Sequence, residues 1–484
     1  MFLLKFSQLD GNKGTHPWNT LSQYLPKWKV SFSITSGKWN HFHPRLYFRE
    51  VESFSSKTLC LMEGKIENHD QRMNCPHCKC MMHVHDVYNR RLRHLPFSNM
   101  LLFVDYQRYR FMCPKCGEML YEDVPFQHTS HRITDSLYMF TSDLLAYGFT
   151  NKQVAAITGL SKNTVKDIDL ERLQKLYTVD GKTLKKPERQ ARRLGIDEFK
   201  LHDGHVFATV IIDLDTGHVL WLAHGKKKKA VYDFIDFVGL EWMSKVEAVA
   251  CDMNSDYEEV FRDTCSHIAV VFDHFHIWKN FNEKVIAAVR KEEQARLKAE
   301  GKTEEAAHLK KSKYVLTSSR ETLAMKDKKA ESQVAVPGDD DCLFKGGKKK
   351  VFKDGNIERY EQLISENKLL LTADLIKEKL SYAYKLDKET DMRSEIEDMI
   401  SICNGTENEH FKWFAKLLGN HIDGIVSHAR YKISSGKVEG TNNMIKTLRR
   451  TAYGYPDDDY FFLKIMDASR KSYTRNPKSH KFGD

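Results

Sequence analysis

The chain lacks long apolar runs. In 484 residues no stretch approaches the roughly 18 consecutive apolar residues that a membrane helix needs. The opening MFLLKF is too short for the apolar core of a signal peptide. No convincing internal repeat is present either. The lack of a membrane helix and of a signal peptide predicts a cytoplasmic protein without a membrane partner.

What remains is the composition of an ordinary globular protein. Hydrophobic residues make up 41% of the chain and charged residues 29%, which is enough apolar material for a sizeable core. The length predicts about two to four domains. The formal net charge of +10 favours association with a polyanion, although many basic proteins bind no nucleic acid.

The ten cysteines are unevenly distributed, and five of them fall between Cys75 and Cys116. In a long chain without a signal peptide, such clustering points to a metal site and not to disulfides. Two CxxC pairs, CPHC and CPKC, offer four thiolates, which is a common ligand set for structural Zn²⁺. The predicted zinc ligands are Cys75, Cys78, Cys113 and Cys116.

Two further groups of residues bear on this prediction. Alternative ligands close to the first pair are Cys80, His83 and His85. The scattered cysteines are interpreted as buried thiols: Cys60, Cys251, Cys265, Cys342 and Cys403.

The segment TNKQVAAITGLSKNTVKDID, from Thr150 to Asp169, predicts a helix-turn-helix. A short helix would end in a turn at Gly159, and Ser161 would cap a second helix. Residues expected to face the major groove or its phosphates are Lys162, Asn163, Thr164 and Lys166. Many helical pairs share this pattern, but its position beside a zinc ribbon and before a basic linker favours DNA binding.

From Leu194 onward the pattern changes to short β-rich runs. GIDEFKL, HVFATVIIDLDTG and HVLWLAHG predict three antiparallel strands separated by turn signals. A helix (AVYDFIDFVGLEWM), a strand (VEAVACD), a helix (SDYEEVFRDTC) and a strand (HIAVVFD) follow. This order is that of a ribonuclease-H-like α/β fold. A charged helical insertion at about 277–430 contains a loop, Pro337 to Lys350, that is expected to be exposed.

Three acids in this region are placed to share a metal site. Asp197 interrupts an apolar strand, Asp252 follows the apolar run AVAC directly, and Glu439 opens the helix-like stretch GKVEGTNNMIKTLRR. Two Mg²⁺ or Mn²⁺ ions held by such carboxylates clamp the attacking and leaving oxygens of a phosphodiester. Asp197 would bridge the two ions, and the other two acids would each hold one.

Other acids compete for these roles, since any single carboxylate is more often a surface charge. Glu198 competes with Asp197, although strand alternation turns it to the opposite face. Asp256 and Asp273 compete with Asp252, and His276 is expected either near the metals or bonded to a backbone carbonyl. One face of the last helix joins the glutamate to groups that suit DNA phosphates: Glu439, Asn443, Lys446 and Arg450.

The order of these motifs resembles that of the insertion-sequence transposases of the ISL-three family, a DDE group. The residues that carry the resemblance are CPHC, CPKC, GLSKNTVKDID, GIDEF, ACDMN, VFDHFHIWK and above all SSGKVEGTNNMIKTLRRTAYGY. It implies that Asp197, Asp252 and Glu439 are the metal-binding triad. It also implies cleavage at the ends of a mobile element, strand transfer into double-stranded target DNA, and a homo-oligomer that pairs two ends inside a bacterial nucleoid.

The predicted organisation has five parts. They are residues 1–65 of unknown role, a zinc ribbon at 66–125, a helix-turn-helix at 126–180, a basic linker at 181–193 and the core at 194–475. Two other functions remain open at this point: a DNA-binding regulator derived from a transposase, and a ribonuclease-H-like nuclease that cuts without joining.

Overall fold

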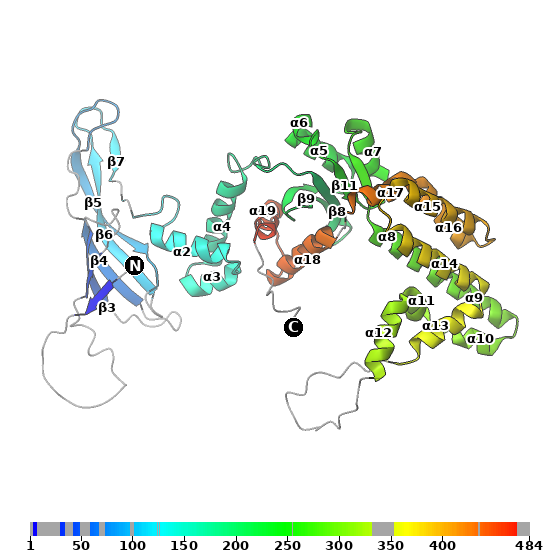
Figure 1. Cartoon of the computed structure of the whole chain (residues 1–484). Helices are drawn as coiled ribbons and strands as arrows, with labels where there is room; N and C mark the ends of the chain where they lie inside the picture. Colours follow the sequence, from blue (N-terminus) through cyan, green and yellow to red (C-terminus); the bar gives the residue numbers. More distant parts are fainter. Residues whose placement is uncertain are drawn as a thin grey trace, which may run out of the picture. The chain divides into compact units, whose positions relative to one another are not determined.

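The computed structural model describes the backbone of four strands in the first 72 residues, and residues 73–96, 101–122, 124, 126–253, 255–331, 353–433 and 436–471. The chain divides into two compact units. Figure 1 labels the helices and strands of both. The first comprises Met1–Lys185 and Leu448–Lys464, and the second comprises Lys186–Thr447 and Ile465–Asp484. The predicted exposed loop from Pro337 to Lys350 lies outside the described residues, as do the side chains of Cys60 and Cys342.

A five-stranded sheet with the order β3-β4-β6-β5, in which β7 also pairs with β6, forms the first part of unit one. Its strands are β3 (Phe42–Phe48), β4 (Leu59–Ile66), β5 (His83–Arg93), β6 (Leu101–Met112) and β7 (Met119–Tyr121). A separate pair is formed by β1 (Leu3–Phe6) and β2 (Val30–Ser33). The sequence predicted no element before residue 65, yet β4 lies parallel to β6 of the ribbon.

Three helices follow in unit one: α2 (Asp135–Ala146), α3 (Asn151–Thr158) and α4 (Lys162–Tyr177). Thr150 and Gln153 form a capping box at the start of α3, and Gly159 ends that helix in the left-handed region with a φ of 73°. The hydroxyl of Ser161 then accepts from the backbone N–H of Thr164 at 3.0 Å. The predicted helix pair and its turn are therefore present, and local capping accounts for both.

The start of α19 (Asp458–Ser469) belongs to the same unit as α4. The carboxylate of Asp169 is fully buried, and it accepts from Tyr460 Oη at 2.6 Å and from Lys464 Nζ at 2.8 Å. Arg172 pairs with its other oxygen. Burying a carboxylate is costly unless it has such partners. These bonds therefore join the first part of α19 to α4.

The second unit is built on a sheet with the order β10-β9-β8-β11-β12. Its strands are β8 (Arg193–His202), β9 (Val206–Asp213), β10 (Val219–His224), β11 (Ala248–Cys251) and β12 (Ala269–Phe272). The first three are antiparallel, whereas β11 is parallel to both β8 and β12. The predicted ribonuclease-H-like order of a meander followed by alternating helix and strand is confirmed.

The helices that follow the meander are α5 (Lys228–Val238), α6 (Leu240–Met243) and α7 (Ser255–Thr264). The sequence predicted one continuous helix where α5 and α6 stand. Gly239 breaks it, because the φ of 90° at this residue is incompatible with a right-handed helix. Leu194 and Ile196 of β8 share one hydrophobic core with α5 and α7.

The opposite side of β8 is approached by α18 (Gly436–Thr451). Gly195 makes this approach possible, because a β-carbon there would lie 2.7 Å from Val438 Cγ2. Residues 434 and 435, directly before this helix, lie outside the described residues.

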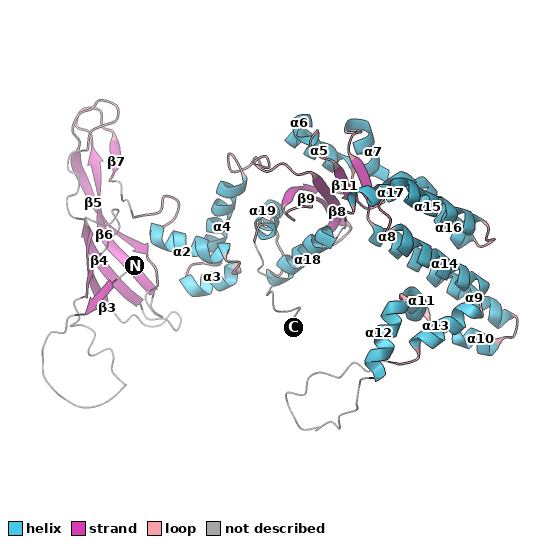
Figure 2. Ribbon diagram, in the orientation of Figure 1, coloured by secondary structure: helices cyan, strands magenta, loops and turns pink. Residues whose placement is uncertain are grey.

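The predicted helical insertion is also confirmed, and Figure 2 shows that its described part is helical. It runs from α8 (His274–Asn280) and a π-helical turn (Phe281–Ile286) through α9 (Ala287–Ala299), α10 (Thr303–His308), α11 (Lys313–Thr317), α12 (Arg320–Glu331), α13 (Asn356–Ser365), α14 (Lys368–Ala383), α15 (Glu389–Asn404), α16 (Glu409–Asn420) and α17 (Ile422–Tyr431). Among the described residues, no helix has the length and apolar character needed to cross a bilayer.

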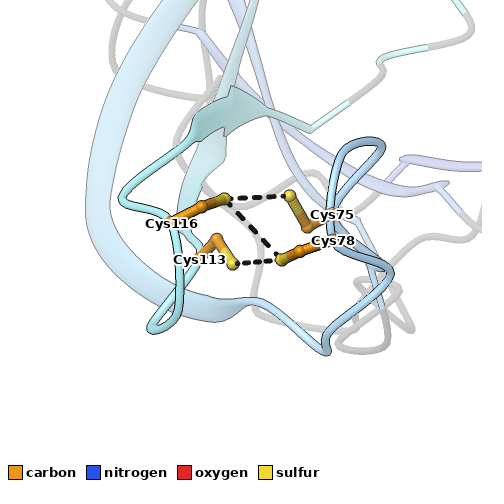
Figure 3. A group of neighbouring side chains, drawn as sticks. All are labelled: Cys75, Cys78, Cys113 and Cys116. Carbon is orange, nitrogen blue, oxygen red and sulfur yellow. Dashed lines mark hydrogen bonds between the residues drawn. The ribbon is translucent and has the colours of Figure 1, made fainter.

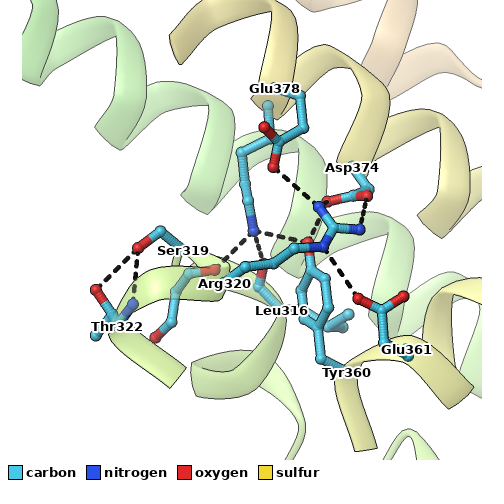
Figure 4. A network of polar contacts seen from close by, with 10 residues as sticks. Leu316, Ser319, Arg320, Thr322, Tyr360, Glu361, Asp374 and Glu378 are labelled. Atoms are coloured by element: carbon cyan, nitrogen blue, oxygen red, sulfur yellow. Dashed lines mark hydrogen bonds and ion pairs between the residues drawn. The ribbon is translucent and has the colours of Figure 1, made fainter. Parts of the chain in front are cut away.

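A polar network holds part of the insertion together (Figure 4). The guanidinium of Arg320 reaches both oxygens of Asp374, and Tyr360 Oη donates to the same carboxylate. Lys377 Nζ donates to the carbonyl oxygens of Leu316 and Ser318. These bonds link α11, α12, α13 and α14 through side chains that are largely removed from water.

Candidate functional site

Two of the three predicted acids lie side by side at one end of the core sheet. Ala250 of β11 pairs with Gly195 of β8 in parallel register, so two residues later Asp252 and Asp197 stand level with each other. In the same way Phe272 of β12 pairs with Cys251, which places Asp273 level with Asp252. The three parallel strands therefore place three carboxylates at the same end of the sheet.

Both oxygens of Asp197 are engaged. Its Oδ1 accepts from the backbone N–H of Glu198 at 2.7 Å, and its Oδ2 accepts from Asn442 Nδ2 at 2.6 Å. Burial raises the pKa of Asp197, and the neighbouring Asp252 carboxylate adds to this effect. A bound cation would oppose this effect, because its charge stabilises the carboxylate form of the acid.

Asp252 is paired with a histidine. His276 Nδ1 lies 3.1 Å from Asp252 Oδ1, and His276 Nε2 lies 3.9 Å from Asp273 Oδ2. Asp273 itself is buried and caps α8 by accepting from the N–H of Phe275 at 3.1 Å. Of the two expectations for His276, the structure supports proximity to the acids. Asp273, which the sequence treated as a competitor, contributes to the same site.

These side chains line one small cavity, and Val438 closes it from the side of α18. The lining residues are Ile196, Asp197, Ala250, Cys251, Asp252, Asp273, His276 and Val438. Glu439 follows Val438 but is exposed and does not line the cavity. Among the described residues, the structure does not bring Asp197, Asp252 and Glu439 together so closely that one ion would touch all three.

The predicted face of α18 is exposed, as DNA contact would require. Asn443, Lys446 and Arg450 all lie at the surface. The sequence missed Asn442, the neighbour that reaches Asp197. The sequence offers no signal for this contact, because it joins residues 245 positions apart and depends on the approach of Val438 to Gly195.

Glu198 belongs to a different environment from Asp197. Its Oε1 accepts from Tyr257 Oη of α7 at 2.8 Å, while Asp197 bonds to α18. The expectation that alternation separates these two acids therefore agrees with their partners. Carboxylate oxygens such as those at the strand ends are the ligands that hard divalent cations prefer. Within the described residues, the four cysteines are the group whose ligand atoms lie close enough together to hold one ion.

The four predicted cysteines of the ribbon form a compact group (Figure 3). Their sulfurs all lie within 4.8 Å of one another, with Cys78 to Cys113 at 3.3 Å, Cys75 to Cys116 at 3.4 Å and Cys78 to Cys116 at 3.7 Å. Four sulfurs at about 2.3 Å from a tetrahedral zinc ion stand roughly 3.8 Å apart, so the residues fit zinc.

The backbone turns lower the pKa of Cys75 and Cys113, whereas hydrogen bonds from the other sulfurs raise the pKa of Cys78 and Cys116. The backbone N–H of Cys116 donates to Cys113 and lowers the pKa of that thiol to about 6. Cys80, His83 and His85 are not part of the group. The four-cysteine set is thus the one the structure selects within the described residues.

The predicted recognition helix α4 presents its first residues to the surface. Lys162 and Asn163 are exposed, and Thr164 is half-buried with its hydroxyl 2.9 Å from that of Ser161. Lys166 differs, because its Nζ lies 2.9 Å from Asp457 Oδ2. The predicted DNA contact of Lys166 therefore has an internal competitor.

The scattered cysteines were predicted to be buried thiols, and this is confirmed for the three whose side chains are described. Cys251, Cys265 and Cys403 are buried.

Comparison with known protein families gives a match for the core and another for the zinc ribbon. Residues 194–465 match the model of DDE transposases of the ISL-three family, described as "Transposase". Residues 71–116 match the "zinc-finger of transposase IS204/IS1001/IS1096/IS1165".

Two similar relatives span most of the chain. The transposase for insertion sequence element IS1001 of Bordetella parapertussis is 28% identical over 400 residues, covering 82% of this chain and 88% of the relative. The transposase for insertion sequence element IS1557 of Mycobacterium tuberculosis is 23% identical over 390 residues, covering 76% and 78%.

Proposed function

Because the chain belongs to the ISL-three family of DDE transposases, we propose that it binds the terminal inverted repeats of an insertion sequence and catalyses metal-dependent DNA cleavage and strand transfer. The main support for this proposal is that Asp197 and Asp252 follow paired positions of two adjacent parallel strands. Both side chains line the same cavity. It lies within the part of the chain that matches the family.

Phosphodiester transfer depends mainly on charge neutralisation and alignment of the reacting oxygens. Two Mg²⁺ or Mn²⁺ ions, when bound, would supply that neutralisation and lower the pKa of the attacking water or 3′-hydroxyl. Asp197 and Asp252 would hold them from the sheet, and Glu439 would complete the set from α18. His276, at 3.1 Å from Asp252, would orient that carboxylate.

The remaining basic and amide groups would position DNA. Asn443, Lys446 and Arg450 on the exposed face of α18 would contact phosphates near the scissile bond. The start of α4, with Lys162, Asn163 and Thr164, would contact the element end. The zinc ribbon would bind the same end. Two ends must be paired for joining, so the working form would be a homo-oligomer assembled on DNA.

The test is a cleavage and strand-transfer assay on labelled DNA that carries the element ends, with and without Mg²⁺. The native chain is expected to give cleaved and joined products, which Asp252→Asn and Glu439→Gln abolish while still binding the ends. Cleavage without joining would favour a nuclease. Binding without any metal-dependent product would favour a regulator, and equal activity in the variants would mean that other carboxylates hold the metal.

A further inference from the structure

Asn442 connects α18 to the Asp197 carboxylate across 245 positions of sequence. Its Nδ2 donates to Asp197 Oδ2 at 2.6 Å, while the backbone N–H of Glu198 donates to Oδ1. One donor on each oxygen fixes both the rotation and the tilt of the carboxylate. Among the described residues, the backbone N–H of Glu198 would be its remaining hydrogen-bond donor without Asn442.

The other end of the same amide is unusual. Asn442 Oδ1 is buried and has no hydrogen-bond partner among the described residues. The amide cannot simply turn over, because two acceptor oxygens would then face each other at the distance where Nδ2 now donates. A buried acceptor of this kind needs a hydrogen-bond donor, and the described residues provide none.

We propose that Asn442 is a positioning residue of the cation site: its Nδ2 holds Asp197 in the orientation that binds the ion, and its Oδ1 accepts a hydrogen bond from a water or hydroxyl that enters with the ion. This inference rests on the proposed function. It assigns a role to a residue that lies one turn after Glu439 on the helix that closes the cavity.

The adjacent residue provides a matched control. Asn443 has the same side chain on the same helix but is exposed, and its proposed contact with DNA phosphates plays no part in a metal-binding measurement without DNA. The side chain of Asn442 is partly buried and bonded to Asp197. Replacing each by alanine removes the same atoms and changes helix propensity equally, so any difference between the variants reports the contact with Asp197.

The first experiment measures Mn²⁺ binding to the full chain without DNA, by electron paramagnetic resonance. Asp197→Asn is expected to abolish the site, Asn442→Ala to weaken it by about tenfold, and Asn443→Ala to leave it within about twofold of the native chain. If Asn442→Ala binds as the native chain does while Asp197→Asn does not bind, this inference fails and the proposed site stands. If Asp197→Asn binds normally, the proposed site itself fails.

A second variant separates positioning from a merely structural role. Asn442→Asp replaces the donor by a second carboxylate beside Asp197, and the like charges disfavour the folded state until a cation joins them. Its melting temperature without metal should fall, and Mn²⁺ should raise it by more than it raises that of the native chain. An equal Mn²⁺-dependent rise in both proteins would overturn the inference.

Discussion

Gly195 of β8 faces Val438 of α18 so closely that a β-carbon on the glycine would lie 2.7 Å from Val438 Cγ2. Two residues further along the strand and one turn further along the helix, Asp197 bonds to Asn442. The close packing of Gly195 against Val438 and the hydrogen bond from Asn442 to Asp197 therefore belong to one contact between β8 and α18. This contact places the helix that carries Glu439 at the edge of the cavity.

We predict that Gly195→Ala separates this strand from this helix. The new methyl group would also lie 2.8 Å from Leu214 Cδ2, so the variant should lose about 1–3 kcal/mol of unfolding free energy. DNA cleavage should fall more than DNA binding, because the shift moves Glu439 of α18 away from Asp197, whereas the proposed DNA contacts of α4 remain. Urea unfolding and the cleavage assay measure the two effects, and a further Val438→Ala change should restore part of both.

Gly440→Ala is the control for this prediction. Gly440 lies on the same helix, and a β-carbon there would meet no atom within 4 Å. Its substitution should leave stability unchanged or raise it by up to about 1 kcal/mol. Equal behaviour of the two alanine variants would contradict the packing argument.

The ion pair between Lys166 and Asp457 predicts an effect on DNA affinity. Asp457→Asn removes the charge but keeps an oxygen to accept from the N–H of Tyr460, so α19 should retain its cap. Freed Lys166 should then bind a phosphate, and the slope of log affinity against log salt should steepen by about 0.9. Fluorescence anisotropy at several salt concentrations measures the slope; weaker binding by a folded Asp457→Asn protein would show that the pair positions α4 for DNA.

The ribbon predicts a specific response to loss of one thiolate. Cys113→Ser should reduce the zinc content below the roughly one ion per chain expected of a four-cysteine site. Binding to element ends should be lost with the ribbon, because a structural zinc ion contributes folding free energy. Metal analysis by mass spectrometry provides the measurement. Cys80→Ser is the control, since Cys80 lies outside the group, and normal zinc content in Cys113→Ser would contradict the assignment.

Lys377 predicts a pH-dependent stability of the insertion. Burial lowers the pKa of Lys377 to about 8, below the value of roughly 10.4 expected in the unfolded chain. Between these values the unfolded chain binds more protons, so this residue makes the unfolding free energy rise with pH. Below about 8 the lysine is charged in both states and its contribution is constant.

The measurement is chemical unfolding of the native chain and Lys377→Met across this pH range. The difference in unfolding free energy between the two proteins should increase as the pH rises through the window. Lys368→Met, which removes an exposed lysine of the same helix, should follow the native curve. A difference that is independent of pH would contradict the lowered pKa.

The sequence predicted those features that depend on local pattern. Alternating and apolar runs identified β8 to β12, and their order was sufficient for the ribonuclease-H-like arrangement. The position of Asp252 directly after β11 followed from the same pattern. The two CxxC pairs predicted the four-cysteine group because the ligand spacing is itself local.

The features that the sequence missed depend on contacts between distant segments. Asn442 reaches Asp197, and Tyr460 and Lys464 reach Asp169, over separations that no periodicity records. The break at Gly239 was missed because the apolar pattern continues through it, and only the backbone angle separates α5 from α6.

We propose that Asp197, Asp252 and Glu439 together hold the catalytic metal ions. The most direct measurement is the anomalous scattering of Mn²⁺ in crystals of the full chain bound to a DNA element end. We expect manganese within about 2.0–2.3 Å of oxygens from Asp197 and Asp252, with Glu439 as a further ligand. Manganese bound by Asp273 and His276 without Asp197, or absent from this cavity, would contradict it.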